Sequence, residues 1–269
     1  MIRICDLHTH STASDGQYSP SELVGKAKAK GIEVLALTDH DSADGLEEAV
    51  SAGESRGVRV IRGIEFSARE YPTFHILGYG FDPAAPGMAS LCAEMKEGRD
   101  ARKYRIIDFL KKKGMDIPIE EVDALAGGVS GRPHFAQLML RHGYISNLRE
   151  AFDLYLDTPE FHAHVERKKP EARTCVETIK AAGGKASLAH PYQIGISDPE
   201  LDALVREMAG WGLDAIECYY PRFSPEQQAY YLLLAEKYGL RVTGGSDFHG
   251  ERVKPDIQLA TLELDADWL

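Results

Sequence analysis

The sequence predicts an α/β protein in which strands and helices alternate, with a helical segment inserted between two parts of that core. Several apolar runs, such as those in 33–38 and 58–65, are continuous rather than alternating, which is typical of strands covered on both faces. Helical patterns follow most of these runs, and strand followed by helix, repeated, implies parallel strands with right-handed crossovers. A chain of 269 residues fits one α/β barrel, or a core domain with an insertion.

In most of the strand–helix units, the strand precedes the helix. We expect strands at 2–7, 33–38, 58–65, 74–79, 185–189, 214–219 and 240–243. The helices expected between and after them are 21–30, 46–56, 171–182, 200–211 and 225–238. Ser19 is a candidate N-cap with Pro20 at the first helical position, and Gly57 is a candidate stop for the second helix.

The middle of the chain has a different pattern. Residues 84–169 show helical stretches separated by loops, and no strand-like run interrupts them. We therefore assign 1–83 and 170–269 to the barrel and 84–169 to a helical insertion that folds over it as a cap.

Composition limits the classes of function. Because 31 Lys and Arg face 42 Asp and Glu, the net charge is −11, which excludes nonspecific nucleic-acid binding through the whole surface. Bound metal ions can reverse the field locally for an anionic substrate. Four widely spaced cysteines argue against disulfides and against a cysteine zinc site. No apolar run approaches the roughly 20 residues of a membrane span and the start has no apolar signal region, so we expect a soluble cytoplasmic protein. The sequence indicates no obligate protein partner.

Histidines and carboxylates recur where predicted strands end. The ends of parallel barrel strands are where active sites gather, and the residues found there are His8, His10, His40, Glu65, His190, Asp247 and His249, while His75 opens the next strand. Residues two apart on an extended segment point to the same side, so His8 and His10 can grip one ion, as can Asp247 and His249. Burying so many titratable groups together is costly unless cations pair them.

The ligand types indicate which metals fit. Imidazole and carboxylate without cysteine suit zinc, manganese or iron. The set is too large for one ion, so we expect two or three divalent ions, with Glu65 as a bridging ligand.

At these residues the sequence resembles the PHP (polymerase and histidinol phosphatase) family. The resemblance rests on Asp6–His10, Asp15, Thr38–His40, Glu65, His75, Ala189–Pro191 and Gly245–His249. It implies a distorted (β/α)7 TIM-like barrel with a trinuclear site. It further implies three ligand groups: His8, His10, Glu65 and Asp247; Glu65, His75 and His190; and Asp15, His40 and His249. Asp6 and Asp39 would then orient neighbouring imidazoles, although Asp6 can equally be structural.

Within the family, the insertion and the stretch 130–135 resemble the branch of 3′,5′-nucleoside bisphosphate phosphatases and 5′-to-3′ oligoribonucleases. The resemblance implies that Arg132 and His134, from the cap, contact phosphate and act in catalysis together with Asp247. Arg167, Lys168 and Arg222 are further candidates for substrate binding. The planar guanidinium of Arg132 matches the geometry of a phosphate group. The alternative is that Arg132 only begins a helix at the surface.

The expected function is hydrolysis of phosphate esters by a metal-activated water, on 3′,5′-nucleoside bisphosphates or short oligoribonucleotides. Other substrates stay open, namely cyclic sugar phosphates, histidinol phosphate and other small phosphomonoesters. A non-catalytic module is a different class, but such copies lose metal residues and this chain keeps all nine. Amide or lactone hydrolysis by a related barrel would call for a lysine at a strand end, and Lys185 starts a strand instead.

Overall fold

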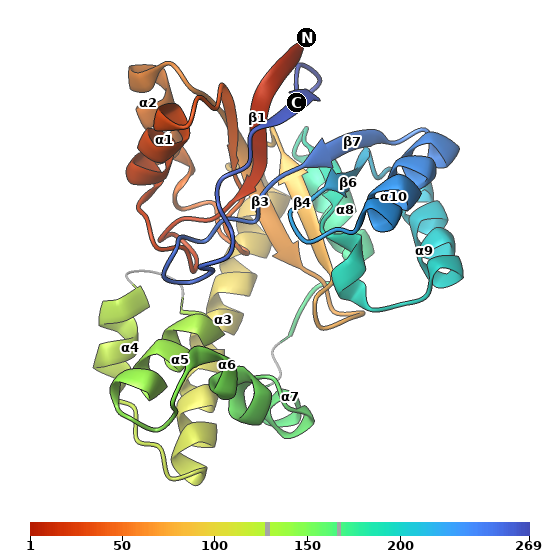
Figure 1. Ribbon diagram of the computed structural model, residues 1–269. Helices are drawn as coiled ribbons and strands as arrows, with labels where there is room; N and C mark the ends of the chain where they lie inside the picture. The colour runs from red at the N-terminus through yellow and green to blue at the C-terminus, as the bar shows by residue number, and fades with distance from the viewer. Residues whose placement is uncertain (127–129, 166–167) are drawn as a thin grey trace.

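The computed structural model describes residues 1–126, 130–165 and 168–269, and among these a single eight-stranded sheet curls into a nearly closed barrel (Figure 1). The strand order around the sheet is β7-β6-β5-β4-β3-β2-β1-β8. The strands are β1 (Ile2–Thr9), β2 (Val34–Leu37), β3 (Arg59–Ser67), β4 (His75–Tyr79), β5 (Lys185–Leu188), β6 (Ala215–Tyr219), β7 (Arg241–Gly244) and β8 (Leu262–Asp265). The seven expected strands are thus confirmed, and β8 is an addition.

Strand direction differs from the all-parallel expectation at two places. β4 runs antiparallel to both β3 and β5, and β8 runs antiparallel to β1. The β3–β4 connection covers only residues 68–74, which is too short for the crossover that a parallel pair needs. Because β4 is reversed, its first residue, His75, lies at the rim where neighbouring strands end.

The barrel closes between β1 and the segment after β7. The Asp247 N–H donates to the His8 carbonyl at 2.8 Å, and the His10 N–H donates to the Phe248 carbonyl at 2.9 Å. Gly245 permits this approach, because a Cβ at that position would lie 2.4 Å from the Cβ of His8. The closure brings His8 and His10, near the start of the chain, next to Asp247 and His249, near its end.

Helices cover the outside of the barrel (Figure 1). Ser19 caps α1 in a reciprocal pair, since its hydroxyl accepts from the Glu22 N–H at 3.3 Å and the Glu22 carboxylate accepts from the Ser19 N–H at 2.9 Å. Gly57, at φ +65°, ends α2. The predicted helices are confirmed as α1 (Pro20–Ala29), α2 (Leu46–Arg56), α8 (Ala172–Ala181), α9 (Asp198–Gly210) and α10 (Pro225–Tyr238), with a short 3-10 turn η2 (Pro191–Ile194).

The inserted segment is helical, and its described residues contain no strand. It comprises α3 (Pro86–Lys112), α4 (Ile119–Ala126), α5 (Arg132–Arg141), α6 (Leu148–Ala151), the π-helical turn η1 (Phe152–Leu156) and α7 (Pro159–His164). Phe109, Phe135 and Phe161 belong to a hydrophobic core of its own. Met88 and Met95, near the start of α3, join the barrel core instead. α3 therefore serves both cores, and the domain boundaries at 84 and 169 stay a prediction.

Within the described part of the chain, no helix combines the length and apolarity that crossing a membrane requires. The four cysteines are thiols, three of them buried, which agrees with the expectation of no disulfide.

Candidate metal centre

The nine candidate ligands lie at one rim of the barrel. His8 is in β1 and His10 directly follows that strand, Glu65 is in β3, and His75 begins β4. The remaining ligands come from loops that follow β2, β5 and β7, or from the loop before α1: Asp15, His40, His190, Asp247 and His249. The prediction that strand ends assemble this set agrees with the structure.

The Glu65 carboxylate lies at the centre of the set and is fully buried. Its Oε2 lies 3.3 Å from His8 Nε2, 3.2 Å from His10 Nε2 and 2.9 Å from His40 Nδ1. Its Oε1 lies 2.8 Å from His75 Nδ1 and 2.9 Å from His190 Nε2. The two oxygens of one carboxylate thus face two groups of imidazoles, which is the arrangement that a bridging ligand requires.

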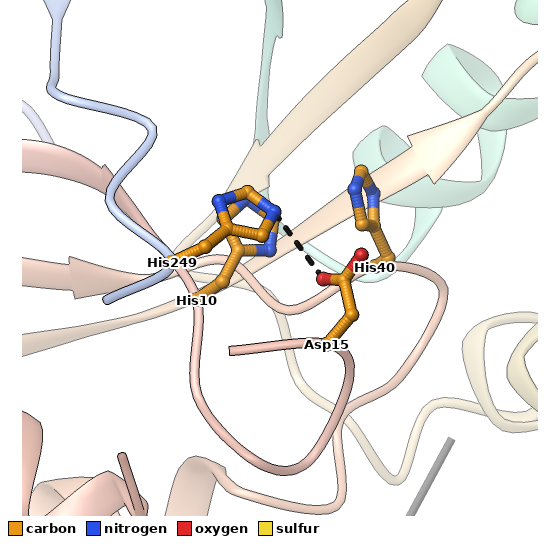
Figure 2. Close-up of side chains that lie close together, drawn as sticks. All are labelled: His10, Asp15, His40 and His249. Atoms are coloured by element: carbon orange, nitrogen blue, oxygen red, sulfur yellow. Dashed lines mark ion pairs between the residues drawn. The ribbon is translucent and has the colours of Figure 1, made fainter. Parts of the chain in front are cut away.

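A second gathering of ligands lies beside this carboxylate. Figure 2 shows His10, His40 and His249 around Asp15, with an ion pair of 3.3 Å between His249 Nε2 and Asp15 Oδ1. The ring of His10 stacks on that of His249 with centroids 4.0 Å apart. Each of the four residues has a ligand atom within 4.8 Å of those of the other three.

The grouping of ligands departs in part from the one that the resemblance implied. His8, His10, Glu65 and Asp247 form the expected first group. His10 also belongs to the group around Asp15, and His40 also groups with Glu65 and His75. His10 and His40 therefore lie between groups rather than in one each.

Unpaired polar atoms test whether this centre fits metal ions. Buried polar atoms normally find hydrogen-bond partners. Several here find none among the described residues: His8 Nε2, both ring nitrogens of His10, His40 Nδ1, His190 Nδ1 and Glu65 Oε2. Glu65 Oε2 nevertheless lies within 3.3 Å of three of these nitrogens. Lone pairs that converge without hydrogen bonding one another fit cations, and the donor set suits zinc, manganese or iron.

Charge coupling within the centre is strong. Burial alone would lower the pKa of His10, but its contacts with Asp247 and Glu65 raise that pKa to about 9. Burial lowers the pKa of His75 to about 3 and that of His249 to about 4. Without metal, protons on some imidazoles balance the carboxylates, and divalent ions would take over that role.

Glu217 supports the ligands from behind, and sequence reasoning missed this role. It is fully buried in β6, with Oε1 3.1 Å from His8 Nδ1, and its Oε2 accepts from the His190 N–H at 2.7 Å. The 214–219 strand pattern placed Glu217 near a strand end, the same signal that marked Glu65. A carboxylate on His8 Nδ1 fixes that ring with Nε2 toward the ligand centre.

Asp39 does not orient an imidazole, which corrects the expectation, whereas Asp6 has the structural role that was its stated alternative. Asp6 accepts from the Ser246 N–H and hydroxyl at 2.9 and 2.6 Å, so it anchors the loop after β7. Asp39 accepts from the Ser11 hydroxyl at 2.7 Å and the Ser14 hydroxyl at 2.6 Å. Both carboxylates shape ligand-bearing loops rather than the imidazole rings.

Asp247 is held by two residues, Tyr220 and Lys254, whose contact with it sequence reasoning did not predict. Its Oδ2 accepts from the Tyr220 hydroxyl at 2.9 Å and from Lys254 Nζ at 2.7 Å, while Oδ1 lies 3.4 Å from His10 Nε2. Asp247 has φ +56° and His190 has φ +23°, conformations that side chains other than glycine adopt rarely and that cluster at functional sites.

The centre opens into a cavity of about 1210 Å3 between the barrel and the inserted helices. Arg132 and Arg222 line this cavity. Arg132 also pairs with Asp157, and Arg222 pairs with Asp256 at 2.7 Å.

The other three substrate candidates differ in position. His134 is buried, and its Nδ1 accepts from the Gly131 N–H at 2.9 Å. Lys168 is 86% exposed and pairs with Glu94 on the surface, so the structure does not bring it to the cavity. Arg167 lies outside the described residues.

Fold and site together define a metal-dependent hydrolase of the barrel class. The chain belongs to the PHP family: the PHP domain matches residues 6–186. A solved structure described as a metal-dependent phosphoesterase from Bifidobacterium adolescentis superposes with a TM-score of 0.86 at 30% identity, covering 97% of this chain and 92% of that one.

Curated relatives are similar over most of the chain. A 5′-3′ exoribonuclease of Haemophilus influenzae is 37% identical, over 93% of this chain and 91% of the relative. A 3′,5′-nucleoside bisphosphate phosphatase of Chromobacterium violaceum is 32% identical, over 91% and 86%. A phosphoribosyl 1,2-cyclic phosphate 1,2-diphosphodiesterase of Eggerthella lenta is 33% identical, over 91% and 94%. The chain is therefore a hydrolase that acts on phosphate esters, a metal-dependent phosphoesterase of the PHP family.

Proposed function

We propose that this phosphoesterase acts on 3′,5′-nucleoside bisphosphates or short oligoribonucleotides, using two or three divalent ions. The observation that carries the proposal is the charge of the cavity in front of the ligand centre. Nine of the described residues that line it are Arg or Lys, in a chain whose net charge is −11. Cations concentrated at one cleft attract substrates that carry more than one phosphate.

Zinc, manganese or iron ions would be held by the nine ligands, with Glu65 shared between groups. Such ions supply an activated water at neutral pH and neutralise charge on phosphate oxygens. Asp247 contributes Oδ1 to the centre while Tyr220 and Lys254 hold Oδ2. This arrangement fixes the carboxylate and leaves the Lys254 ammonium at the cavity wall.

Two residues of the cap would contact the phosphate. His134 accepts from the Gly131 N–H at Nδ1, so the neutral ring carries its proton on Nε2 and can donate it to a phosphate or leaving-group oxygen. Burial lowers the pKa of His134, which favours that neutral form. Arg132 places its guanidinium at the cavity, whereas His134 is buried next to the lining residue Pro133. Arg222, from the barrel side, would bind a second phosphate.

A second candidate is hydrolysis of a cyclic sugar phosphate. It is favoured by the likeness to the cyclic phosphate diphosphodiesterase, because the same ligand centre would serve a monoester or a diester.

The test is hydrolysis by manganese-loaded protein of four substrate types: 3′,5′-nucleoside bisphosphates, short oligoribonucleotides, cyclic sugar phosphates and histidinol phosphate. Released phosphate is measured for the monoesters, and the phosphomonoester product is measured for the oligoribonucleotides and cyclic phosphates. We expect the highest kcat/KM on the first two. Glu65→Gln, at the shared ligand, should abolish turnover on all four. Preference for histidinol phosphate or a cyclic sugar phosphate in the wild-type protein would contradict the proposed substrate.

A further inference from the structure

The cavity has two chemically different walls. The barrel side carries the ligand centre, whereas the cap side carries Arg side chains interspersed with apolar residues from α5, α6, η1 and α7. These apolar residues are Pro133, Ala136, Leu148, Phe152 and Ala163. Phosphate groups and metal ions gain nothing from apolar surface, so this wall fits another part of the substrate.

Phe152 is the central feature of the cap wall. Among the described residues lining the cavity it is the one aromatic side chain other than imidazole, and it is half-buried. Its inner side packs against the cap's own core, so the ring is supported from behind. A rigid, partly exposed ring on a cavity wall is suited to stacking against a flat ligand.

The backbone that presents Phe152 is unusual. Phe152 begins the π-helical turn η1, and its carbonyl accepts from the Asp157 N–H at 3.1 Å. Single π turns are rare and occur frequently at functional sites. Arg132 braces the end of this turn, since its guanidinium donates to the Leu156 carbonyl at 3.3 Å and pairs with Asp157.

Charged and polar groups surround the ring. The guanidinium carbon of Arg132 lies 6.0 Å from the Phe152 ring centroid, and Arg149 and Gln137 line the same wall. An aromatic face with hydrogen-bonding groups at its edge matches a nucleobase, which has a flat π surface and polar edges. A sugar phosphate without a base has no group that would use this wall.

We propose that the cap wall around Phe152 binds the nucleobase of a substrate whose phosphate lies at the ligand centre. The inference rests on the proposed nucleotide function and names its second recognition element. The cavity, at about 1210 Å3, has room for a nucleotide spanning from cap to barrel.

The test compares adenosine 3′,5′-bisphosphate with its abasic analogue, 1-deoxyribose 3,5-bisphosphate. Phe152→Ala should raise KM for the nucleotide about tenfold, because base stacking on an aromatic side chain contributes on the order of 1–3 kcal/mol. KM for the abasic substrate should stay within about twofold, since the lost contact involves only the base. Competitive inhibition by adenosine, which carries no phosphate, should weaken by about the same tenfold factor.

Two further variants separate recognition from folding. Phe152→Leu keeps an apolar side chain against the cap core but loses the π face, so it should show the same substrate-selective effect. Leu154, on the same π turn, is 57% exposed and does not line the cavity, so Leu154→Ala is the matched control and should change neither KM.

Equal effects of Phe152→Ala and Phe152→Leu on both substrates, or none on either, would overturn the inference while leaving the phosphoesterase function intact. Wild-type protein that cleaves neither substrate would instead overturn the proposed function.

Discussion

Replacing Glu217 by Gln should weaken metal binding without changing side-chain volume. The Glu217 carboxylate acts as an acceptor on both sides, with Oε1 3.1 Å from His8 Nδ1 and Oε2 accepting from the His190 N–H at 2.7 Å. An amide offers only one acceptor oxygen. If that oxygen serves His190, the amide NH2 faces His8 Nδ1 and drives the ring proton to Nε2, the atom 3.3 Å from Glu65 Oε2.

The size of the effect follows from this conflict. A protonated His8 Nε2 cannot be a ligand, and the alternative orientation of the amide leaves the buried His190 N–H facing a donor. Loss of such a supporting partner typically costs 10- to 100-fold in metal affinity. This corresponds to about 1.4–2.7 kcal/mol of binding free energy. Turnover at fixed low manganese should fall in proportion to occupancy.

The assay is titration of metal-free protein with manganese against a fluorescent chelator, followed by circular dichroism to verify the fold. Glu263→Gln, an exposed change on β8 far from the ligands, is the matched control and should keep wild-type affinity. Wild-type affinity in Glu217→Gln would refute the role of Glu217 in orienting His8.

Three other perturbations have definite expected outcomes. Burial would lower the pKa of His10, but neighbouring carboxylates outweigh this effect and raise the pKa to about 9. Below that pH, manganese must therefore displace a proton from His10 to bind. Apparent affinity should therefore rise between about pH 6.5 and 9; calorimetry in two buffers of different ionisation enthalpy would show the proton release, and pH-independent affinity would contradict it. Lys254→Met removes a cavity-lining ammonium 2.7 Å from Asp247, and should raise substrate KM about tenfold at saturating manganese; an unchanged KM would contradict this role. Gly245→Ala should destabilise the barrel by about 3 kcal/mol in urea unfolding, whereas Gly87→Ala, which meets no atom within 4 Å, should not; equal midpoints would contradict the closure argument.

The sequence predicted most of the candidate centre because barrel strand ends leave a clear pattern. His8, His10 and His40 were recognisable as polar residues directly after or at the end of apolar runs. Their convergence needed no knowledge of exact angles, since parallel strands deliver their ends to one rim.

Strand direction could not be predicted in the same way. An apolar run of β type carries no sign of its direction, so the reversal of β4 became visible only in the pairing with β3 and β5. The short segment 68–74 was the available signal, because it leaves no room for a crossover helix.

The sequence did not predict the residues that position metal ligands rather than bind metal themselves. Glu217 lies near a strand end, but its contact with His8 depends on tertiary packing. Lys254 lies in a loop without a motif, and its contact with Asp247 depends on tertiary packing as well. The π turn that presents Phe152 likewise depends on hydrogen bonds that local sequence preference does not specify.

The most direct test of the central claim is anomalous diffraction at the manganese edge from crystals of the manganese-loaded protein. The account predicts two or three peaks at the barrel rim, at least one of which lies beside the Glu65 carboxylate. The account would be contradicted if crystals saturated with manganese showed no anomalous peak at this rim and the same protein left phosphate esters intact.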